Sequence, residues 1–132
     1  MRRVTPAEAK YRANYHRKVM GMVFNFCFGQ TILPHKCDGP MDPMHFIPKQ
    51  ILRREAKSRG YTDQETWELV WDARNGAPGC RWFHNSLDTP GVKKIVIPQN
   101  KLPRAAIDFC YDNGFVSVLD RLYPADKGEN DG

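Results

Sequence analysis

Apolar residues recur at helical spacing in several segments of the chain, and each segment opens with residues that favour a helix start. Thr5, Pro6 and Glu8 predict an N-cap, a first helical position and a capping box for a basic helix that runs to about Met20. Pro48 is expected to open a second helix, basic on its polar side, that ends near Gly60.

Four further helical segments follow. A capping box predicts a helix over residues 63–73, a proline at position 78 could begin one that carries residues 80–88, and residues 102–103 open an amphipathic helix. Residues 115–123 are expected to form a last helical piece.

Strand signals are short. Residues 23–28 could be a strand or the buried end of the first helix, residues 29–43 are rich in turn residues with room for only very short strands, and residues 93–98 alternate toward a strand. The pattern therefore predicts one compact α+β domain over residues 1–124 and a disordered tail over residues 125–132.

Composition agrees with a globular, non-membrane protein. Of the 132 residues, 41% are hydrophobic and 27% are charged. The longest apolar run, residues 20–28, is well short of the roughly 18 residues that a membrane span needs, and no secretory signal pattern accompanies it. We therefore expect a cytoplasmic protein, in the host cell cytoplasm if a phage encodes it.

Charge is distributed unevenly. Residues 1–60 carry 12 Lys and Arg against 4 Asp and Glu, whereas residues 61–132 carry 8 against 11. A basic half favours a polyanionic partner such as nucleic acid, although a solvated helix face has the same composition.

The four cysteines form no Cys-x-x-Cys pair, which argues against a complete zinc knuckle and against a dense disulfide framework. Reduced thiols are expected. Cys27 and Cys110 lie among apolar neighbours, where a free cysteine usually packs as a small hydrophobic residue.

Three segments carry residues suited to phosphodiester hydrolysis, which needs a base and a cation. They are residues 42–48, 72–76 and 80–88, and they contain His45, Asn75 and His84 in that order. In this order and context the chain resembles the HNH endonuclease family over about residues 37–88. The resemblance implies a ββα-metal core with a helical insertion and with flanking N- and C-terminal helices.

The resemblance also implies roles for these residues. His45 would take a proton from the attacking water, Asn75 would fix the connecting loop and so the His45 imidazole, and His84 would bind the metal ion. Asp88 follows His84 by four positions, so that both side chains would emerge on one helix face and could hold a cation close to His45.

The chain departs from the family pattern next to the base. Met44 stands where most members have Asp or His, and a thioether does not bind a hard divalent cation. Asp42 would project on the same side as Met44 if residues 42–45 are extended, and it is the expected substitute. Asp42, His84 and Asp88 are therefore the predicted ligands of a divalent cation, Mg²⁺ or Mn²⁺ ahead of Zn²⁺.

A structural zinc site is the second departure. Cys37 and Cys80 match one member of each cysteine pair that many relatives carry, whereas Pro34 and Phe83 occupy the other two positions. Two thiolates are too few for a closed site, though His35 could add a third ligand. A buried thiol pair or simple packing is expected ahead of zinc.

The segment between His45 and Asn75 is longer than in compact family members and is interpreted as an insertion. Basic residues there and beside the motif could contact nucleic-acid backbone or could form a solvated surface; they are Lys49, Arg53, Arg54, Lys57, Arg74 and Arg81. Lone histidines at positions 16 and 35 and the tryptophans are expected to be structural.

The sequence thus predicts a metal-dependent endonuclease of a small phage or mobile-element type, acting on DNA. The alternative is a catalytically inactive HNH-like protein that binds nucleic acid or serves assembly. It is motivated by Met44 and by the missing cysteines.

Overall fold

The computed structural model describes residues 4–21, 27–37, 40–88 and 96–125, with backbone only for residues 86–88. Its α-helices are α1 (Pro6–Met20), α2 (Lys49–Ser58), α3 (Asp63–Val70), α4 (Arg81–Asp88), α5 (Arg104–Asp112) and α6 (Val116–Leu122). Its 3-10 helices are η1 (Phe28–Thr31), η2 (Ala73–Asn75) and η3 (Gln99–Lys101), and its strands are β1 (Met41–His45) and β2 (Gly76–Cys80).

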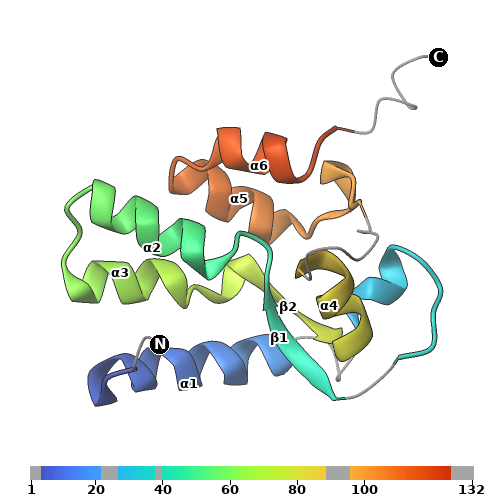
Figure 1. Ribbon diagram of the computed structural model, residues 1–132, viewed down its shortest axis with the longest axis horizontal. Helices are drawn as coiled ribbons and strands as arrows, with labels where there is room; N and C mark the ends of the chain where they lie inside the picture. Colours follow the sequence, from blue (N-terminus) through green and yellow to red (C-terminus); the bar gives the residue numbers. More distant parts are fainter. Residues whose placement is uncertain (1–3, 22–26, 38–39, 89–95, 126–132) are drawn as a thin grey trace.

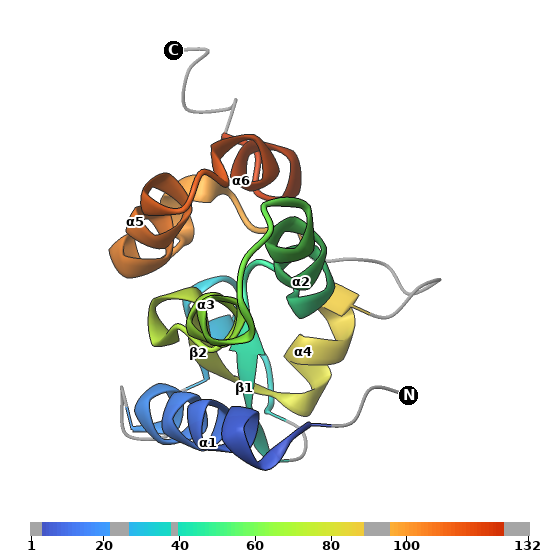
Figure 2. The ribbon, with the colours of Figure 1, turned by 90° about the vertical axis from the view of Figure 1, so that its left-hand side faces the viewer.

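The two strands form an antiparallel pair that occupies the middle of the molecule. As Figures 1 and 2 show, α1 crosses one side of the pair, α4 follows β2 on another, and α5 and α6 lie at the far end from α1. Helices α2 and α3 lie side by side and are inserted between the strands in sequence. The described residues confirm the α+β class expected from the sequence.

The segment around Pro78 was expected to begin a helix, and this prediction is wrong, because residues 76–80 form β2 and α4 begins at Arg81. Pro78 pairs directly with Pro43 of β1. Since Phe46 donates to the Asn75 carbonyl and hydrogen-bonded pairs alternate along an antiparallel ladder, the two prolines occupy a position that needs no N–H donor. The strand therefore tolerates both prolines.

Helix starts follow the predicted caps. The Thr62 hydroxyl accepts from the Glu65 backbone N–H and the Glu65 carboxylate accepts from the Thr62 N–H, so the predicted capping box of α3 is confirmed. This helix ends at Val70 rather than near residue 73, where the chain turns into η2. At α1, the Thr5 hydroxyl caps the Glu8 N–H, but the Glu8 carboxylate accepts from Arg53 and Trp71, so only half of the predicted capping box is found among the described bonds.

One core joins the six α-helices, both strands and η1. Its largest fully buried side chains include Tyr15, Met44, Leu52, Phe83 and Phe109. Trp71 is buried as expected, whereas Trp82 is 40% exposed. The core therefore ties the inserted helices to the strand pair that they interrupt in sequence.

Some sequence predictions concern residues outside the described ranges. Most of residues 23–28, residues 93–95 and the tail from residue 126 onward belong to this group. Residues 96–98, the described end of the expected last strand, have no regular secondary structure. Among the described helices, none combines the length and the apolar character that a bilayer crossing requires.

Candidate functional site

His45 ends β1 and lies against helix α1. Its imidazole stacks on the Tyr15 ring with centroids 4.5 Å apart and meets Trp71 edge-on at 5.5 Å. Its Nε2 lies 2.8 Å from the Val70 carbonyl oxygen. A carbonyl only accepts, so Nε2 carries the proton of the neutral ring and Nδ1 carries the lone pair.

Burial lowers the pKa of His45 to about 4, against a smaller opposing effect of the Val70 carbonyl. The cations of Lys49, His16 and Arg53 lower it further. The ring is therefore neutral at pH 7 in the free protein.

Asn75 is fully buried, directly precedes β2 and bonds the segment that follows His45. Its side-chain oxygen accepts from the Ile47 N–H at 2.9 Å, and its amide nitrogen donates to the Ile47 carbonyl at 3.0 Å. The Asn75 carbonyl accepts from the Phe46 N–H at 2.9 Å. These three bonds fix the backbone immediately after His45.

Asp42 and His84 are close together on the other side of β1. His84 Nδ1 lies 3.3 Å from Asp42 Oδ2, and Arg81 Nε lies 3.3 Å from the same oxygen. Burial raises the pKa of Asp42, but hydrogen bonds from Arg81 and His84 outweigh this effect, so the pKa is lowered. The side chain of Asp88, the third predicted ligand, is outside the described residues.

A cation on these ligands was expected to lie close to His45, but the structure does not have this arrangement. His45 pairs with Gly76, where a Cβ atom would meet the Tyr15 hydroxyl of α1. Asp42 pairs with Gly79, against which Met44 packs on the α4 side. Because side chains alternate along a strand, His45 and Asp42 emerge on opposite faces of β1.

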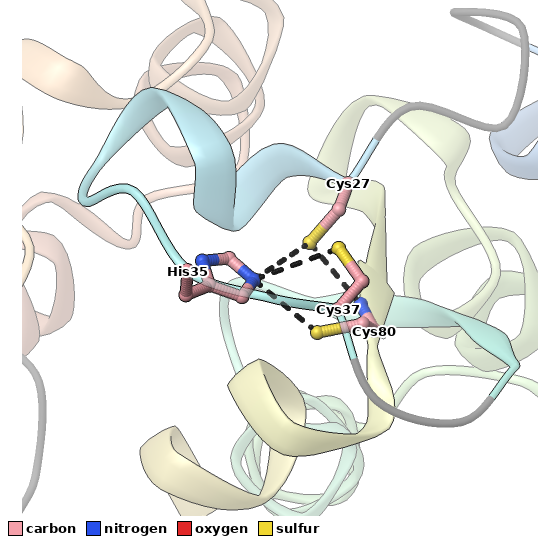
Figure 3. A group of neighbouring side chains, drawn as sticks. All are labelled: Cys27, His35, Cys37 and Cys80. Atoms are coloured by element: carbon pink, nitrogen blue, oxygen red, sulfur yellow. Dashed lines mark hydrogen bonds between the residues drawn. The ribbon is translucent and has the colours of Figure 1, made fainter.

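A different group of residues brings four potential metal ligands together. The ligand atoms of Cys27, His35, Cys37 and Cys80 all lie within 4.8 Å of one another, as Figure 3 shows. His35 Nε2 lies 3.7 Å from the Cys27 and Cys37 sulfurs and 3.3 Å from the Cys80 sulfur. This cluster could hold a metal ion.

The surroundings of the cluster hold its donors in place. His35 Nδ1 lies 3.0 Å from the Leu33 carbonyl, which leaves the Nε2 lone pair for the centre. The Cys80 N–H donates to the Cys27 sulfur at 3.3 Å, and the Gln30 amide donates to the Cys37 sulfur at 3.3 Å. Burial, as the largest cause, raises the pKa of the Cys27 thiol in the metal-free chain.

The sequence interpretation named Cys37 and Cys80, with His35 as an optional third ligand, and favoured a buried thiol pair or packing over zinc. It missed Cys27, which it treated as a small hydrophobic residue. Cys27 instead supplies the missing sulfur, from the residue before η1. The His35-x-Cys37 spacing was the available signal, but nothing local linked it to Cys27.

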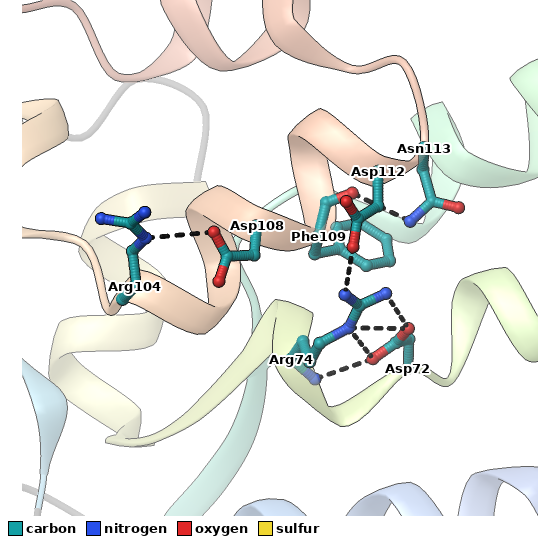
Figure 4. Close-up of polar contacts among 7 residues, drawn as sticks. All are labelled: Asp72, Arg74, Arg104, Asp108, Phe109, Asp112 and Asn113. Atoms are coloured by element: carbon teal, nitrogen blue, oxygen red, sulfur yellow. Dashed lines mark hydrogen bonds and ion pairs between the residues drawn. The ribbon is translucent and has the colours of Figure 1, made fainter.

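Of the basic residues proposed for nucleic-acid contact, Arg74 is committed to internal bonds. Its guanidinium bonds both Asp72 oxygens and the Asp112 carboxylate at 2.8 Å, which fastens α5 to η2 (Figure 4). These two carboxylates raise its pKa. The prediction that Arg74 contacts nucleic acid is therefore not supported by its position.

The remaining basic residues differ in their surroundings. Arg53 pairs with the buried carboxylate of Glu8 at 3.0 Å, and Arg81 pairs with Asp42. Exposed basic side chains on α2 are Lys49, Arg54 and Lys57.

Comparison of this chain with models of protein families, with curated proteins and with solved structures finds no match.

Proposed function

We propose that the protein is a zinc-containing endonuclease that hydrolyses phosphodiester bonds in nucleic acid, DNA first, with His45 as the general base. The observation that carries the proposal is the state of His45. Its ring is neutral, its Nε2 is engaged by Val70, and among the described residues its Nδ1 has no hydrogen-bond partner. A base needs such a lone pair at a fixed position.

The elements around His45 are those that the HNH resemblance implies. Strands β1 and β2 and helix α4 follow in that order, and Asn75 holds the backbone two residues after the base. A pKa of about 4 is low for a catalyst at neutral pH. Bound phosphate would raise it, because a negative charge favours the protonated ring.

The Cys27, His35, Cys37 and Cys80 cluster suits a structural zinc ion. Zinc bonds of about 2.0 Å to nitrogen and 2.3 Å to sulfur in a tetrahedron separate the two atoms by roughly 3.6 Å. The His35 nitrogen lies 3.3 to 3.7 Å from the three sulfurs. One ring nitrogen cannot hydrogen-bond three thiols through a single lone pair, whereas a shared cation accounts for all three distances.

Zinc at this position would have a structural role. Four protein ligands leave no open coordination position for water or substrate. The ion would join the chain around residues 27–37 to Cys80, where β2 meets α4, and so hold the β1–β2–α4 unit together.

For the divalent cation of the reaction we propose Asp42 and His84. Asp42 is already bonded to Arg81, so the cation must displace that guanidinium. Because these ligands face away from His45, their part in the reaction is tested separately from that of the base.

The experiment is cleavage of supercoiled and branched DNA with Mg²⁺, with Mn²⁺ and with chelator, by wild type, His45→Gln and Asp42→Asn. Glutamine keeps a donor for the Val70 carbonyl but offers no basic nitrogen, so zinc content and fold should persist. Loss of general-base catalysis should lower the cleavage rate by on the order of 10²-fold or more. Equal cutting by His45→Gln would end the assignment of the base.

A second candidate is a nucleic-acid-binding protein that keeps the ββα arrangement without catalysis. Met44 favours it, because this residue is 1% exposed where the family resemblance calls for a metal ligand. That protein would bind DNA with an affinity that falls steeply with salt and does not change with Mg²⁺, and it would cut under none of the conditions above.

A further inference from the structure

Basic side chains from two helices converge on the indole of Trp71. The His16 ring of α1 lies 6.2 Å from it and the His45 ring 5.5 Å. From α2, Lys49 Nζ lies 5.4 Å and Arg53 Cζ 5.9 Å from the ring centroid. Three basic groups from the two helices therefore surround one aromatic ring beside the base.

Arg12 extends this group, because it lies four positions before His16 and so on the same face of α1. We call Arg12, His16, Lys49 and Arg53 the Trp71 cluster. Arg12, His16 and Lys49 are exposed, so a ligand in solution can reach them.

Positive charge in the Trp71 cluster exceeds the negative charge that the described residues supply. Partial desolvation of the Lys49 ammonium first, and then Arg53 and Arg12, lower its pKa, although the residue as a whole is exposed, and Glu8 is the carboxylate that opposes them. Glu8 is buried, and its Oε2 already accepts from Arg53 at 3.0 Å and from Trp71 Nε1 at 2.9 Å. Little of its charge is left for the exposed cations.

Hydrogen-bond donors are in excess as well. Arg53 Nη1 is buried and has no partner among the described residues. Leaving a buried donor unpaired is unfavourable, so native sites usually supply an acceptor. A region with surplus cations and a surplus donor matches an anion rich in oxygen acceptors.

We propose that the Trp71 cluster binds a phosphate group of the nucleic-acid substrate, held between Arg12 and His16 of α1 and Lys49 of α2, beside His45. As a substrate contact, this site rests on the function proposed above. The phosphate offsets the repulsion among the cations and brings negative charge next to His45. It also gives α1, which lies outside the HNH resemblance, a part in substrate binding.

The first test uses inorganic phosphate and the full, zinc-loaded chain. Side-chain NMR follows the histidines through a pH titration in phosphate and in chloride of equal ionic strength, with His16→Gln and His45→Gln to assign the signals. Phosphate should raise the pKa of His16 and of His45 relative to chloride. Equal titration in both salts would overturn the site.

The second test measures binding of a short fluorescent DNA by anisotropy. Arg12→Gln and Lys49→Gln should each weaken binding by roughly tenfold, as loss of a charged hydrogen bond does, and should lower the salt slope by about 1. Arg121→Gln on α6 and Lys101→Gln on η3 remove the same charges from exposed positions and should change affinity by less than about twofold. Equal weakening by the control pair would mean general surface charge and would overturn the site.

These outcomes separate the two proposals. If Lys49→Gln loses phosphate binding and the wild type does not cleave DNA, the phosphate site is supported and the nuclease assignment is overturned. If the wild type cleaves DNA and Arg12→Gln and Lys49→Gln cleave as fast as the control variants Arg121→Gln and Lys101→Gln, the nuclease assignment is supported and the phosphate site is overturned.

Discussion

Two groups of potential metal ligands in this protein differ in what else their side chains bond. In the Cys/His cluster of Cys27, His35, Cys37 and Cys80, four ligand atoms lie within 4.8 Å of one another. In the Asp42–His84 pair, one carboxylate oxygen is shared by a histidine and by Arg81. The ligand atoms of the first group converge, whereas the carboxylate of the second is already paired with the Arg81 guanidinium.

The difference shows that a sequence motif does not specify which side chains converge on a metal ion. The HNH resemblance pointed to His84 as a metal ligand and not to His35, yet the His35 ring is the one that a backbone carbonyl orients so that its Nε2 is free. A metal site requires that ligands converge and that their other bonds leave a lone pair at the centre. Both conditions depend on contacts between segments distant in sequence.

The largest effect should follow loss of a cluster ligand. Cys27→Ser removes a thiolate, so zinc binding and the folding free energy coupled to it are lost, on the order of 5 kcal/mol or more. Zinc content by mass spectrometry and thermal unfolding check this. Cys110→Ala, at a buried cysteine outside the cluster, should keep one zinc per chain and lose about 1–2 kcal/mol. Equal zinc content in Cys27→Ser would contradict the site.

The next effect concerns the backbone behind the base. Asn75→Ala leaves the Ile47 N–H and carbonyl without partners in the core and should lower the free energy of unfolding by about 2–4 kcal/mol. Urea unfolding measures this. Asn113→Ala removes one partly buried bond, to the Phe109 carbonyl, and should cost about 1 kcal/mol or less. A similar loss in both variants would show that the Asn75 bonds are not special.

The pH dependence of stability should report on His45. Its pKa is about 4 in the folded chain, below the ordinary value of 6.5 that it takes in the unfolded chain, so the unfolded state takes up a proton first. Stability is complete above pH 6.5 and falls as pH drops toward 4, by up to about 3 kcal/mol. Urea midpoints between pH 7 and pH 4 should fall more steeply for wild type than for His45→Gln. Parallel curves would contradict a buried neutral ring.

The smallest effect is expected at Arg81. Its side chain is 53% exposed beside Asp42, and such surface pairs contribute about 0–1 kcal/mol. Arg81→Gln should change the unfolding free energy by less than about 0.5 kcal/mol, as measured by urea unfolding. A loss above about 1 kcal/mol would make the Asp42–Arg81 pair a structural element and weaken Asp42 as a cation ligand.

Much of the fold was predictable because its signals are local. Helix α3 begins where Thr62 and Glu65 form a capping box, and α1 begins at Pro6 after Thr5. The local pattern misplaced the second strand of the expected ββα core, because Pro78 favours a helix start and only its pairing with Pro43 makes a strand position acceptable. That pairing joins segments separated by the two inserted helices.

The class of fold, most helix starts and the residues able to do chemistry follow from the sequence, since caps, turns and side-chain types act over a few neighbours. Which of these residues meet depends on the tertiary structure. The fold places Cys27 beside Cys80 and pairs Arg74 with Asp112. It also turns His45 toward α1 and Asp42 toward α4. The physical reason is that strand pairing and core packing set the facing of each side chain, and both act between distant segments.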